Sequence, residues 1–332
     1  MLTLSQADAV FAPLARHGKL LLAVSGGPDS VALMLLAAAW AGKHETRLSV
    51  ATVDHGLREG SATEAEIVGH WANALGFAHS ILQWSGDKPA SRIQEKARAM
   101  RYHLLCEHAR QTGATGLVTA HHADDQAETI LFRLTKGSGV SGLSGMRAKV
   151  RRGGLCHWRP LLDFPKAALV SLCQSEGHRF FDDPSNRNER FARTGLRRLA
   201  GLLGAEGLDC EALLRLGRRA ARAEDALAAM AVTCAAQWNG VHAPQIFVAD
   251  GRFLANIPAE IALRLLEAEV LAVTGSQEPL RLERLERALA RMLAALAGGA
   301  GLATSLGGAL IRLHASGQLK ITPEPPRRRG RD

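Results

Sequence analysis

Two kinds of side chain that often mark a function are scarce in this sequence. Its 332 residues include five cysteines, and no two of them stand at C-x-x-C spacing. The absence of that spacing excludes a zinc knuckle and argues against a redox centre built from neighbouring thiols. Aromatic residues make up 5% of the chain, so a sheet that stacks RNA bases on aromatic rings is not indicated.

Long apolar runs and a leader peptide are also missing. The longest apolar run, residues 31–42, is too short to span a bilayer and suits a buried helix. No basic region stands ahead of apolar residues at the N-terminus, so no signal peptide is predicted. Together with the odd, unpaired set of cysteines, these absences predict a reduced cytoplasmic protein with no membrane partner.

Neither sign of charge is rare, but positive charge exceeds negative. Lysine and arginine number 41 against 32 aspartate and glutamate, which gives a net charge of +9 and an isoelectric point near 9.8. This balance points to a polyanionic partner, although it says nothing about the fold. Hydrophobic residues form 47% of the chain, enough for a core, and the length predicts about two domains.

Apolar runs and helical patterns alternate through the first part of the chain. Short buried strands are expected at 20–24, 48–53 and 115–120, with helices at 31–42, 61–76, 91–112 and about 125–135. This alternation is typical of an α/β fold with a doubly wound parallel sheet.

The composition changes near residue 200, where glycines mark a linker. Beyond it, helices are expected at 211–237, 258–273 and 278–296, and short strands at 245–249, 308–313 and 318–321. The sequence thus predicts a first domain over 1–205, a second, smaller α-rich domain over 206–322, and a disordered basic tail over 323–332.

A glycine-rich turn joins the first strand to the first helix. Its sequence is Ser25-Gly26-Gly27-Pro28-Asp29-Ser30. The glycines let backbone N–H groups approach phosphate oxygens, the serines add hydroxyl donors, and the helix N-terminus adds partial positive charge. Asp29 could hold Mg²⁺ or cap the helix. The turn matches neither the Walker nor the Rossmann fingerprint, and an ordinary strand-to-helix turn is the alternative.

Polar residues follow the ends of the other expected strands. Asp54 and His55 come after the second strand, and His121 follows the third. Ligands bind at the carboxyl ends of strands in open α/β sheets, so these side chains are candidates for a site. His121 and Asp125 are four residues apart and would meet if the helix begins early.

Paired charges occur on two of the expected helices. Arg98 and Arg101 share one helix face and could meet a phosphate, while Asp125 and Glu128 are one turn apart and could hold an amine. Each pair also has a structural alternative. The arginines could form a solvated face, and Asp125 with Glu128 could form a capping box.

Two basic clusters could bind a polyanion. The first contains Arg147, Lys149, Arg151 and Arg152, and the second contains Arg187, Arg190, Arg193, Arg197 and Arg198. Spacing of i, i+3, i+7 places Arg190, Arg193 and Arg197 along one stripe of a helix. Contacts of this kind with phosphates supply affinity but little sequence information. An exposed charged helix is the alternative.

These motifs, in this order, resemble one enzyme family. The matching segments are SGGPDS at 25–30, VDHGLR at 53–58, RAMRY at 98–102, TAHHADDQAET at 119–129, GSG at 137–139 with Gly142-Leu143, RPLL at 159–162, and DPSN at 183–186 followed by Arg190, Arg193 and Arg197. Over roughly residues 18–200 the chain resembles the tRNA(Ile)-lysidine synthetase family of the PP-loop ATP-pyrophosphatase superfamily.

The resemblance implies a fold and a reaction. The first domain would be a PP-loop catalytic domain, similar to adenine-nucleotide alpha hydrolases, and the second an accessory domain that contacts tRNA. With Mg²⁺, ATP would adenylate the C2 oxygen of the wobble cytidine in a CAU-anticodon isoleucine tRNA. The ε-amine of L-lysine would then displace AMP, and the product would read AUA in place of AUG.

The resemblance also implies roles for individual residues. Asp29, Arg101, His121 and Arg197 would be catalytic, with Asp29 also the metal ligand. ATP or pyrophosphate would bind at Ser25, Gly26, Gly27, Pro28, Asp29, Ser30, Asp54 and His55, lysine at Asp125 and Glu128, and tRNA at Arg147, Lys149, Arg151, Arg152, Arg190 and Arg193. Thr194-Gly195 departs from the Arg-Asn expected there, and a glycine within a helix costs about 1 kcal/mol relative to alanine.

Three other functions stay open at this point. A tRNA-thiolating PP-loop enzyme would typically use paired cysteines, which are absent. A non-catalytic nucleotide- or RNA-binding module would bind without releasing AMP. A small-molecule amidotransferase of the same fold would leave the basic clusters unexplained. The sequence does not fix the oligomeric state, and a homodimer is one alternative.

Overall fold

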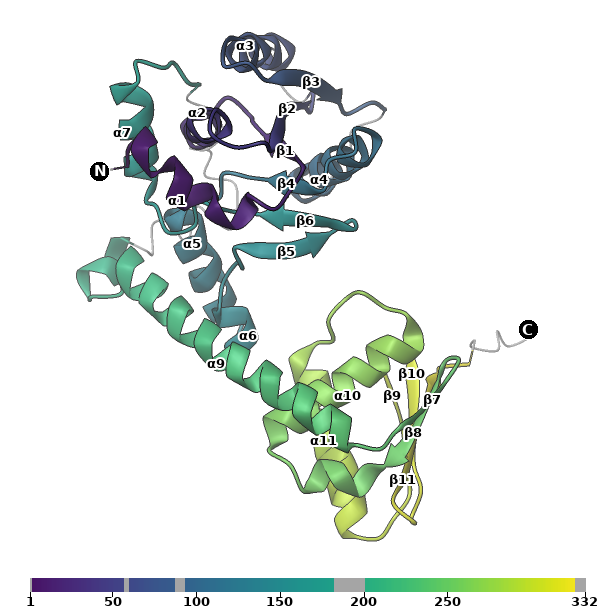
Figure 1. The fold of residues 1–332 in the computed structure, drawn as a ribbon. Coiled ribbons are helices and arrows are strands. Elements are labelled where there is room, and N and C mark those ends of the chain that lie inside the picture. The colour runs from purple at the N-terminus through teal and green to yellow at the C-terminus, as the bar shows by residue number, and fades with distance from the viewer. Residues whose placement is uncertain (1, 57–59, 87–92, 182–200, 326–332) are drawn as a thin grey trace. The chain divides into compact units, whose positions relative to one another are not determined.

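The computed structural model describes residues 2–56, 60–86, 93–181 and 201–325. The chain divides into two compact units, which are described one at a time (Figure 1). The first contains Met1–Lys136 and Ser144–Gly217, and the second contains Gly137–Leu143 and Arg218–Asp332. The predicted domain limits at 205 and 322 remain a prediction. Within the described ranges no helix is long and apolar enough to cross a membrane.

A six-stranded sheet forms the centre of the first unit. Its strand order is β3-β2-β1-β4-β6-β5. The strands are β1 (Lys19–Ala23), β2 (Arg47–Asp54), β3 (Ala78–Gln83), β4 (Gly116–Val118), β5 (Lys149–Arg152) and β6 (Leu155–Trp158). Five strands are parallel, as predicted, whereas β5 pairs antiparallel with β6 at one edge.

The β5–β6 hairpin was not predicted. Its two-residue turn is Gly153-Gly154, with φ of 54° and 81°. Two-residue hairpin turns with positive φ at both positions favour glycine, because their geometry matches the twist of paired strands. The glycine pair could therefore have predicted the hairpin. Three of the four residues of β5 are basic, so its sequence shows no apolar run that would predict a strand.

Helices cover both faces of this sheet, and β1 shows why. Leu20 and Leu22 point into one core and Leu21 and Ala23 into another, because successive side chains of a strand alternate. Burial on both faces explains the continuous apolar run in this strand.

The first core packs α1 (Ala7–Phe11), α2 (Pro28–Ala41), α3 (Ser61–Ala74) and α7 (Lys166–Ser175) on one face of the sheet. The second core packs α4 (Ile93–Gln111) on the other face (Figure 1). A smaller cluster joins α5 (Ala123–Leu134) to the start of α9 (Cys210–Gln237). Short 3-10 turns at Leu4–Gln6 and Ala12–Leu14 flank α1.

The second unit combines helices with an antiparallel sheet. The strand order is β7-β8-β11-β10-β9. The strands are β7 (Val241–Ala243), β8 (Ile246–Asp250), β9 (Leu302–Leu306), β10 (Ala309–Leu313) and β11 (Gln318–Pro323). The helices are α6 (Val140–Leu143), the main part of α9, α10 (Ala259–Thr274) and α11 (Leu282–Ala297), with a 3-10 turn at Gly251–Ala255.

One apolar core holds the second unit together. It packs α10 and α11 against the sheet and includes Ile261, Leu266, Met292 and Ile311, none of which has exposed surface. The predicted helices and three predicted strands are present. The exposed strand β7 and the partly exposed strand β9 were not predicted, because neither shows a clear apolar run.

Candidate active site

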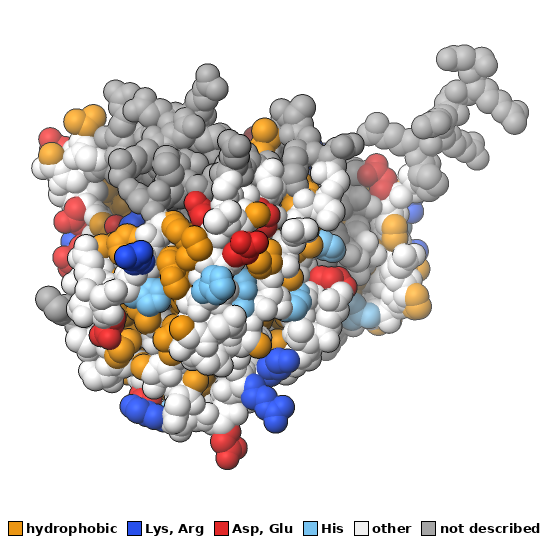
Figure 2. Space-filling model, turned by 90° about the horizontal axis from the view of Figure 1, so that it is seen from above, with side chains coloured by type: hydrophobic (Ala, Val, Ile, Leu, Met, Phe, Trp, Pro, Cys, Tyr) orange, Lys and Arg blue, Asp and Glu red, His pale blue; other side chains and the backbone are white. Residues whose placement is uncertain are grey.

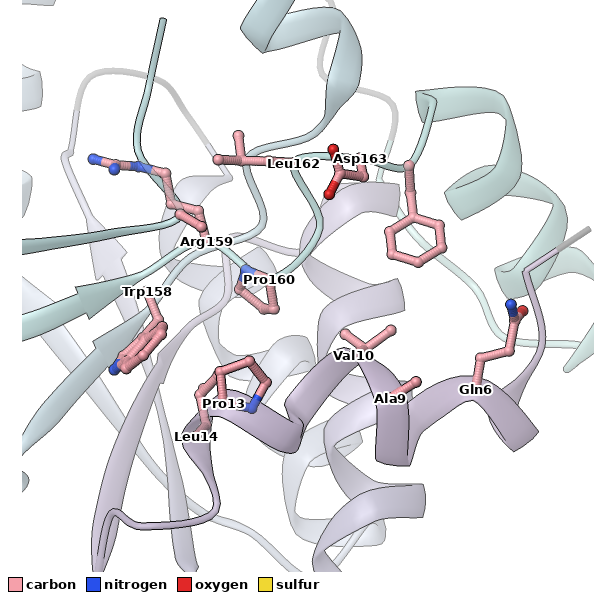
Figure 3. Close-up of a pocket in the computed structure, with 12 residues that line it drawn as sticks. Gln6, Ala9, Val10, Pro13, Leu14, Trp158, Arg159, Pro160, Leu162 and Asp163 are labelled. Atoms are coloured by element: carbon pink, nitrogen blue, oxygen red, sulfur yellow. The ribbon is translucent and has the colours of Figure 1, made fainter. Parts of the chain in front are cut away.

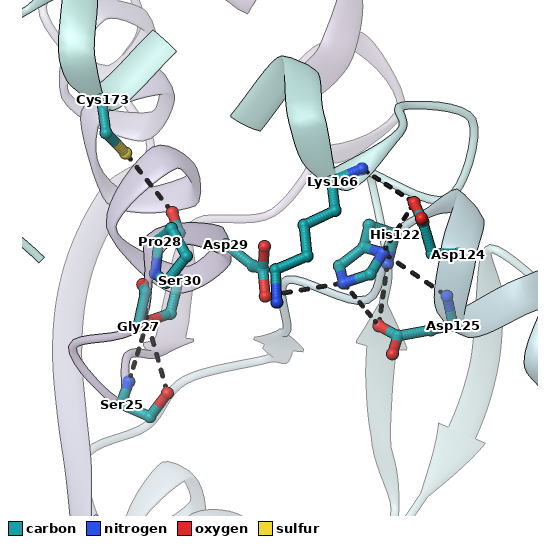
Figure 4. Close-up of polar contacts among 10 residues, drawn as sticks. All are labelled: Ser25, Gly27, Pro28, Asp29, Ser30, His122, Asp124, Asp125, Lys166 and Cys173. Atoms are coloured by element: carbon teal, nitrogen blue, oxygen red, sulfur yellow. Dashed lines mark hydrogen bonds and ion pairs between the residues drawn. The ribbon is translucent and has the colours of Figure 1, made fainter. Parts of the chain in front are cut away.

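The glycine-rich turn of residues 25–30, which we call the phosphate loop, follows β1 and begins α2, as predicted (Figure 4). Ser30 organises it: its Oγ accepts hydrogen bonds from the N–H groups of Ser25 and Gly26, each at 3.1 Å, and donates to the Gly27 carbonyl at 2.9 Å. Pro28 occupies the first turn of α2, where its missing N–H is tolerated. Ser30 therefore holds the shape of the turn at the N-terminus of α2, where a helix offers N–H donors to an anion.

Only glycine suits position 26. Its φ is +86°, and a Cβ built there would lie 2.5 Å from Cδ2 of Phe181 and 3.0 Å from Cγ2 of Val68. Gly27 has open space around it. The first glycine is thus required by packing and backbone geometry, whereas the second leaves room at the loop.

Asp29 faces a histidine that the sequence analysis left without a role. His122 Nε2 lies 3.5 Å from Asp29 Oδ2 and 3.5 Å from Asp125 Oδ2, and His122 Nδ1 lies 3.5 Å from Asp124 Oδ2 (Figure 4). Burial lowers the pKa of His122, but the carboxylates of Asp124, Asp29 and Asp125 outweigh it and raise the pKa to about 10. His122 therefore joins the phosphate loop to the start of α5.

The structure places His122, and not His121, beside Asp125. Helix α5 begins at Ala123 with His122 as its N-cap, so His121 lies outside the helix and the four-residue spacing does not bring it to Asp125. No sequence signal singled out His122, because its partner Asp29 comes from the turn after β1.

The carboxylates of α5 form an acidic group with Asp29. Burial raises the pKa of Asp125, the His122 charge lowers it, and the charges of Asp29 and Glu128 raise it. Asp29 Oδ1 is buried and has no hydrogen-bond partner among the described residues. An acidic group of this kind is suited to a cation, either an ammonium or a hard metal ion.

Asp54 at the end of β2 has a local role in the structure. Its Oδ1 accepts hydrogen bonds from the Gly56 N–H at 2.9 Å and from the Ser61 hydroxyl at 2.7 Å. It therefore ties the loop after β2 to the first residue of α3. His55 packs edge-on against Trp84, with ring centroids 6.2 Å apart.

A second polar cluster lies where β4 and β6 end. The Thr119 Oγ1 is 2.8 Å from His121 Nδ1 and 2.9 Å from His157 Nε2. Arg98 Nη2 reaches His121 Nε2 at 3.3 Å, and Arg159 Nη2 reaches His157 Nδ1 at 3.3 Å. Because a guanidinium only donates, each of these ring nitrogens accepts, and each ring donates to Thr119 through its other nitrogen.

Both histidines of this cluster are neutral. Burial, followed by the charges of Arg159 and Arg98, lowers the pKa of His121 to about 2. Burial, followed by the charges of Arg159 and Arg152, lowers the pKa of His157 to about 3. His121 can therefore donate or accept a hydrogen bond but carries no charge near neutral pH. Burial and the charge of Arg98 also lower the pKa of Arg101.

The first basic cluster of the sequence is divided by strand β5. Lys149 lies over the Trp158 ring, 4.8 Å from its centroid, and Arg152 lies over the Tyr102 ring at 3.9 Å. Arg151 donates to the Gly154 carbonyl, and the Arg147 carbonyl accepts from Arg159. Alternation along a strand sends successive side chains to opposite faces, so β5 does not present one continuous patch.

The second basic cluster lies outside the described residues, so the structure does not describe Arg190, Arg193 or Arg197. The face drawn in Figure 2 shows few lysine and arginine side chains among the described residues, and they are scattered. The described part of that face therefore offers no continuous basic surface to a polyanion.

A cavity of about 340 Å³ lies beside α1 and the segment after β6 (Figure 3). Its lining includes Val10, Leu14, Trp158, Pro160 and Leu162. The Arg159 guanidinium points away from this cavity and not into it (Figure 3). The cavity is mainly apolar and contains none of the predicted site residues.

The chain is similar to proteins of known family. The PP-loop domain family matches residues 3–201. A tRNA(Ile)-lysidine synthase of Methylobacterium nodulans is 50% identical over 317 residues, covering 94% of this chain and 92% of the relative. One from a Bradyrhizobium species is 44% identical over 343 residues, covering 98% and 95%.

A solved structure supports the fold alone. The U34-tRNA thiolase NcsA from Methanococcus maripaludis, with its [4Fe-4S] cluster, has a TM-score of 0.56 and 14% identity, covering 65% of this chain and 77% of that one. The extended identity to the two lysidine synthases decides the family, and this chain belongs to the tRNA(Ile)-lysidine synthase family.

Proposed function

We propose that the protein ligates L-lysine to C2 of the wobble cytidine in the CAU anticodon of isoleucine tRNA, at the expense of ATP. The observation that carries this proposal is the acidic group of Asp29, Asp125 and Glu128 beside a phosphate loop. Such a site can hold an anionic nucleotide and a cationic amine next to each other. Membership of the lysidine synthase family supports the assignment.

We assign the nucleotide to the loop after β1. Backbone N–H groups of the loop and the N-terminus of α2 would hold the pyrophosphate of ATP. The residues fit Mg²⁺ as well, because the buried Asp29 Oδ1 has no partner among the described residues and carboxylate oxygen is a preferred ligand. Bound there, Mg²⁺ would neutralise phosphate charge, and Asp29 would hold it.

We assign the lysine side chain to α5. The carboxylates of Asp125 and Glu128 would orient its ammonium, which must lose a proton before the amine can attack. Asp125 is the candidate proton acceptor, since burial raises the pKa of its carboxyl group. The amine nitrogen then bonds to C2, the bond from C2 to the adenylated oxygen breaks, and AMP leaves.

We assign stabilisation of the adenylate to Arg101 and His121, with Arg197 as a further candidate outside the described residues. Neutral His121 would act as a hydrogen-bond partner and not as a cation. Arg190 and Arg193 remain candidates for contacts with tRNA. The same proposal places the protein in the cytoplasm, with tRNA.

The test is incorporation of labelled lysine into a CAU-anticodon isoleucine tRNA transcript, with ATP and Mg²⁺, followed by mass analysis of the nucleosides. We expect a lysine-sized addition on the wobble cytidine, with one AMP released per lysine transferred. A folded preparation that binds tRNA but transfers no lysine would refute the proposal. AMP release without transfer would retain the adenylating site and reject lysine as the nucleophile.

A further inference from the structure

Three arginines gather near the Tyr102 ring of α4. Arg159 lies just beyond the carboxyl end of β6, whereas Arg152 lies on β5 opposite Leu155, at the amino end of β6. The guanidinium carbon of Arg152 lies 3.9 Å from the Tyr102 ring centroid, and that of Arg98 lies 5.4 Å from it. Arg159 follows β6 directly and is hydrogen-bonded to His157, whose ring centroid lies 5.4 Å from that of Tyr102. We call Arg98, Arg152 and Arg159 the Tyr102 arginine cluster. Burial and the charges of Arg152 and Arg98 lower the pKa of Arg159, so the three cations interact.

This cluster has no acidic counterpart. Within residues 2–56, 60–86, 93–181 and 201–325, none of its three arginines forms an ion pair with a carboxylate. Their polar neighbours are the neutral rings of His121 and His157, which accept hydrogen bonds from Arg98 and Arg159. Like charges at such short range repel each other, so a bound anion would stabilise the cluster.

Arg159 supplies an unused donor at the base of the cluster. Its side chain is 6% exposed, and its Nη1 donates to the Arg147 carbonyl at 2.7 Å. Its Nε is buried and has no partner in the described part of the chain. A buried N–H without an acceptor is costly, whereas an oxygen atom of a ligand would satisfy it. Arg98 and Arg152 are exposed, so a ligand can enter from solvent.

We propose that the Tyr102 arginine cluster binds a phosphate group, and we assign that group to the backbone of the tRNA next to the target cytidine. The RNA assignment rests on the proposed function. Phosphates of ATP have their own donors in the loop after β1, and β6 lies two strands away from β1 in the sheet. Two strand spacings amount to about 10 Å, so a phosphate bound in the loop after β1 does not also occupy the cluster.

The test uses Arg152→Gln, because glutamine removes the charge of this exposed side chain and keeps most of its length. We expect tRNA affinity to fall about tenfold at low salt, and the slope of log affinity against log salt to become shallower by about one. ATP binding without tRNA should not change. The control is Arg47→Gln, which removes the same charge from an exposed position at the amino end of β2 and should alter neither measurement.

Two outcomes would overturn the inference. If Arg152→Gln and Arg98→Gln both bind tRNA like Arg47→Gln, the cluster is not a phosphate site. If they lose ATP affinity and retain tRNA affinity, the phosphate belongs to the nucleotide and the RNA assignment is wrong. Because only binding is measured, a protein that binds tRNA through Arg152 but transfers no lysine would refute the proposed function and leave this inference standing.

Discussion

At the scale of single residues, we expect the adenylating step to depend most on Asp29. Its Oδ1 is buried and has no partner in the described part of the chain, while its Oδ2 faces His122. Loss of the side chain therefore leaves the loop intact but removes a carboxylate from the acidic group. Asp29→Ala is expected to reduce AMP formation at least about a hundredfold, the scale of losing one preorganised electrostatic contact. Labelled ATP with tRNA and lysine measures this directly.

The control for Asp29 is Asp8→Ala, which removes a carboxylate that pairs with Lys43 on the surface. Both variants should bind tRNA as the parent protein does. Unchanged AMP release from Asp29→Ala would remove Asp29 from the nucleotide site.

The shifted pKa of His157 makes the free energy of unfolding depend on pH. The unfolded chain protonates this ring near pH 6.5, whereas burial and the arginine charges keep the pKa of folded His157 at about 3. Its contribution to stability is therefore fully present above pH 6.5 and is lost as the pH falls from 6.5 towards 3, by up to about 1.4 kcal/mol per pH unit. Urea unfolding between about pH 5 and 6.5 should show a shallower dependence in His157→Gln, and an equal slope in both proteins would contradict this.

The site was predictable wherever a residue directly follows a strand, and less so elsewhere. Residues 25–30 and His121 follow the ends of strands, as predicted. His122 and His157 could not be assigned, because their partners Asp29, Arg159 and Thr119 come from other elements. The basic side chains of residues 147–152 do not form one patch, and this could not be predicted because the strand within that segment was not recognised.

At the scale of elements, the turn between β1 and α2 is fixed by one glycine. Gly26→Ala is expected to lower the free energy of unfolding by about 1–3 kcal/mol, because its φ of +86° strains other residues and its Cβ would clash with Phe181. Gly27→Ala, with open space around it, should leave stability unchanged. Urea unfolding of the two variants is the measurement, and equal losses would show that packing at Gly26 is relaxed.

Elements with strong apolar runs were predictable to within a few residues, and those without them were not. The helices α2, α4 and α9 matched their expected ranges closely. By contrast, β3 has a mixed and partly exposed sequence, and β7 and β9 are short or exposed. These segments are strands because they pair with neighbouring strands, which the local sequence does not reveal.

At the scale of the whole molecule, the two units have separate cores. Leu266 is fully buried in the second unit, and Leu266→Ala is expected to cost about 2–5 kcal/mol there. ATP binding, which we assign to residues of the first unit, should survive in the same variant. Calorimetry with and without ATP tests this, and loss of ATP binding in the folded variant would show that the units depend on each other.

The rings of His121 and His157, which are both hydrogen-bonded to Thr119, have a consequence for how the enzyme responds to its surroundings. Both rings stay neutral far below physiological pH, and guanidinium groups keep their charge far above it. The electrostatic potential at the Tyr102 arginine cluster is therefore constant throughout the range of pH that a cell experiences. Its attraction for a phosphate is instead weakened by dissolved ions. The affinity of this cluster for RNA should therefore fall as the ionic strength rises and should not change with pH.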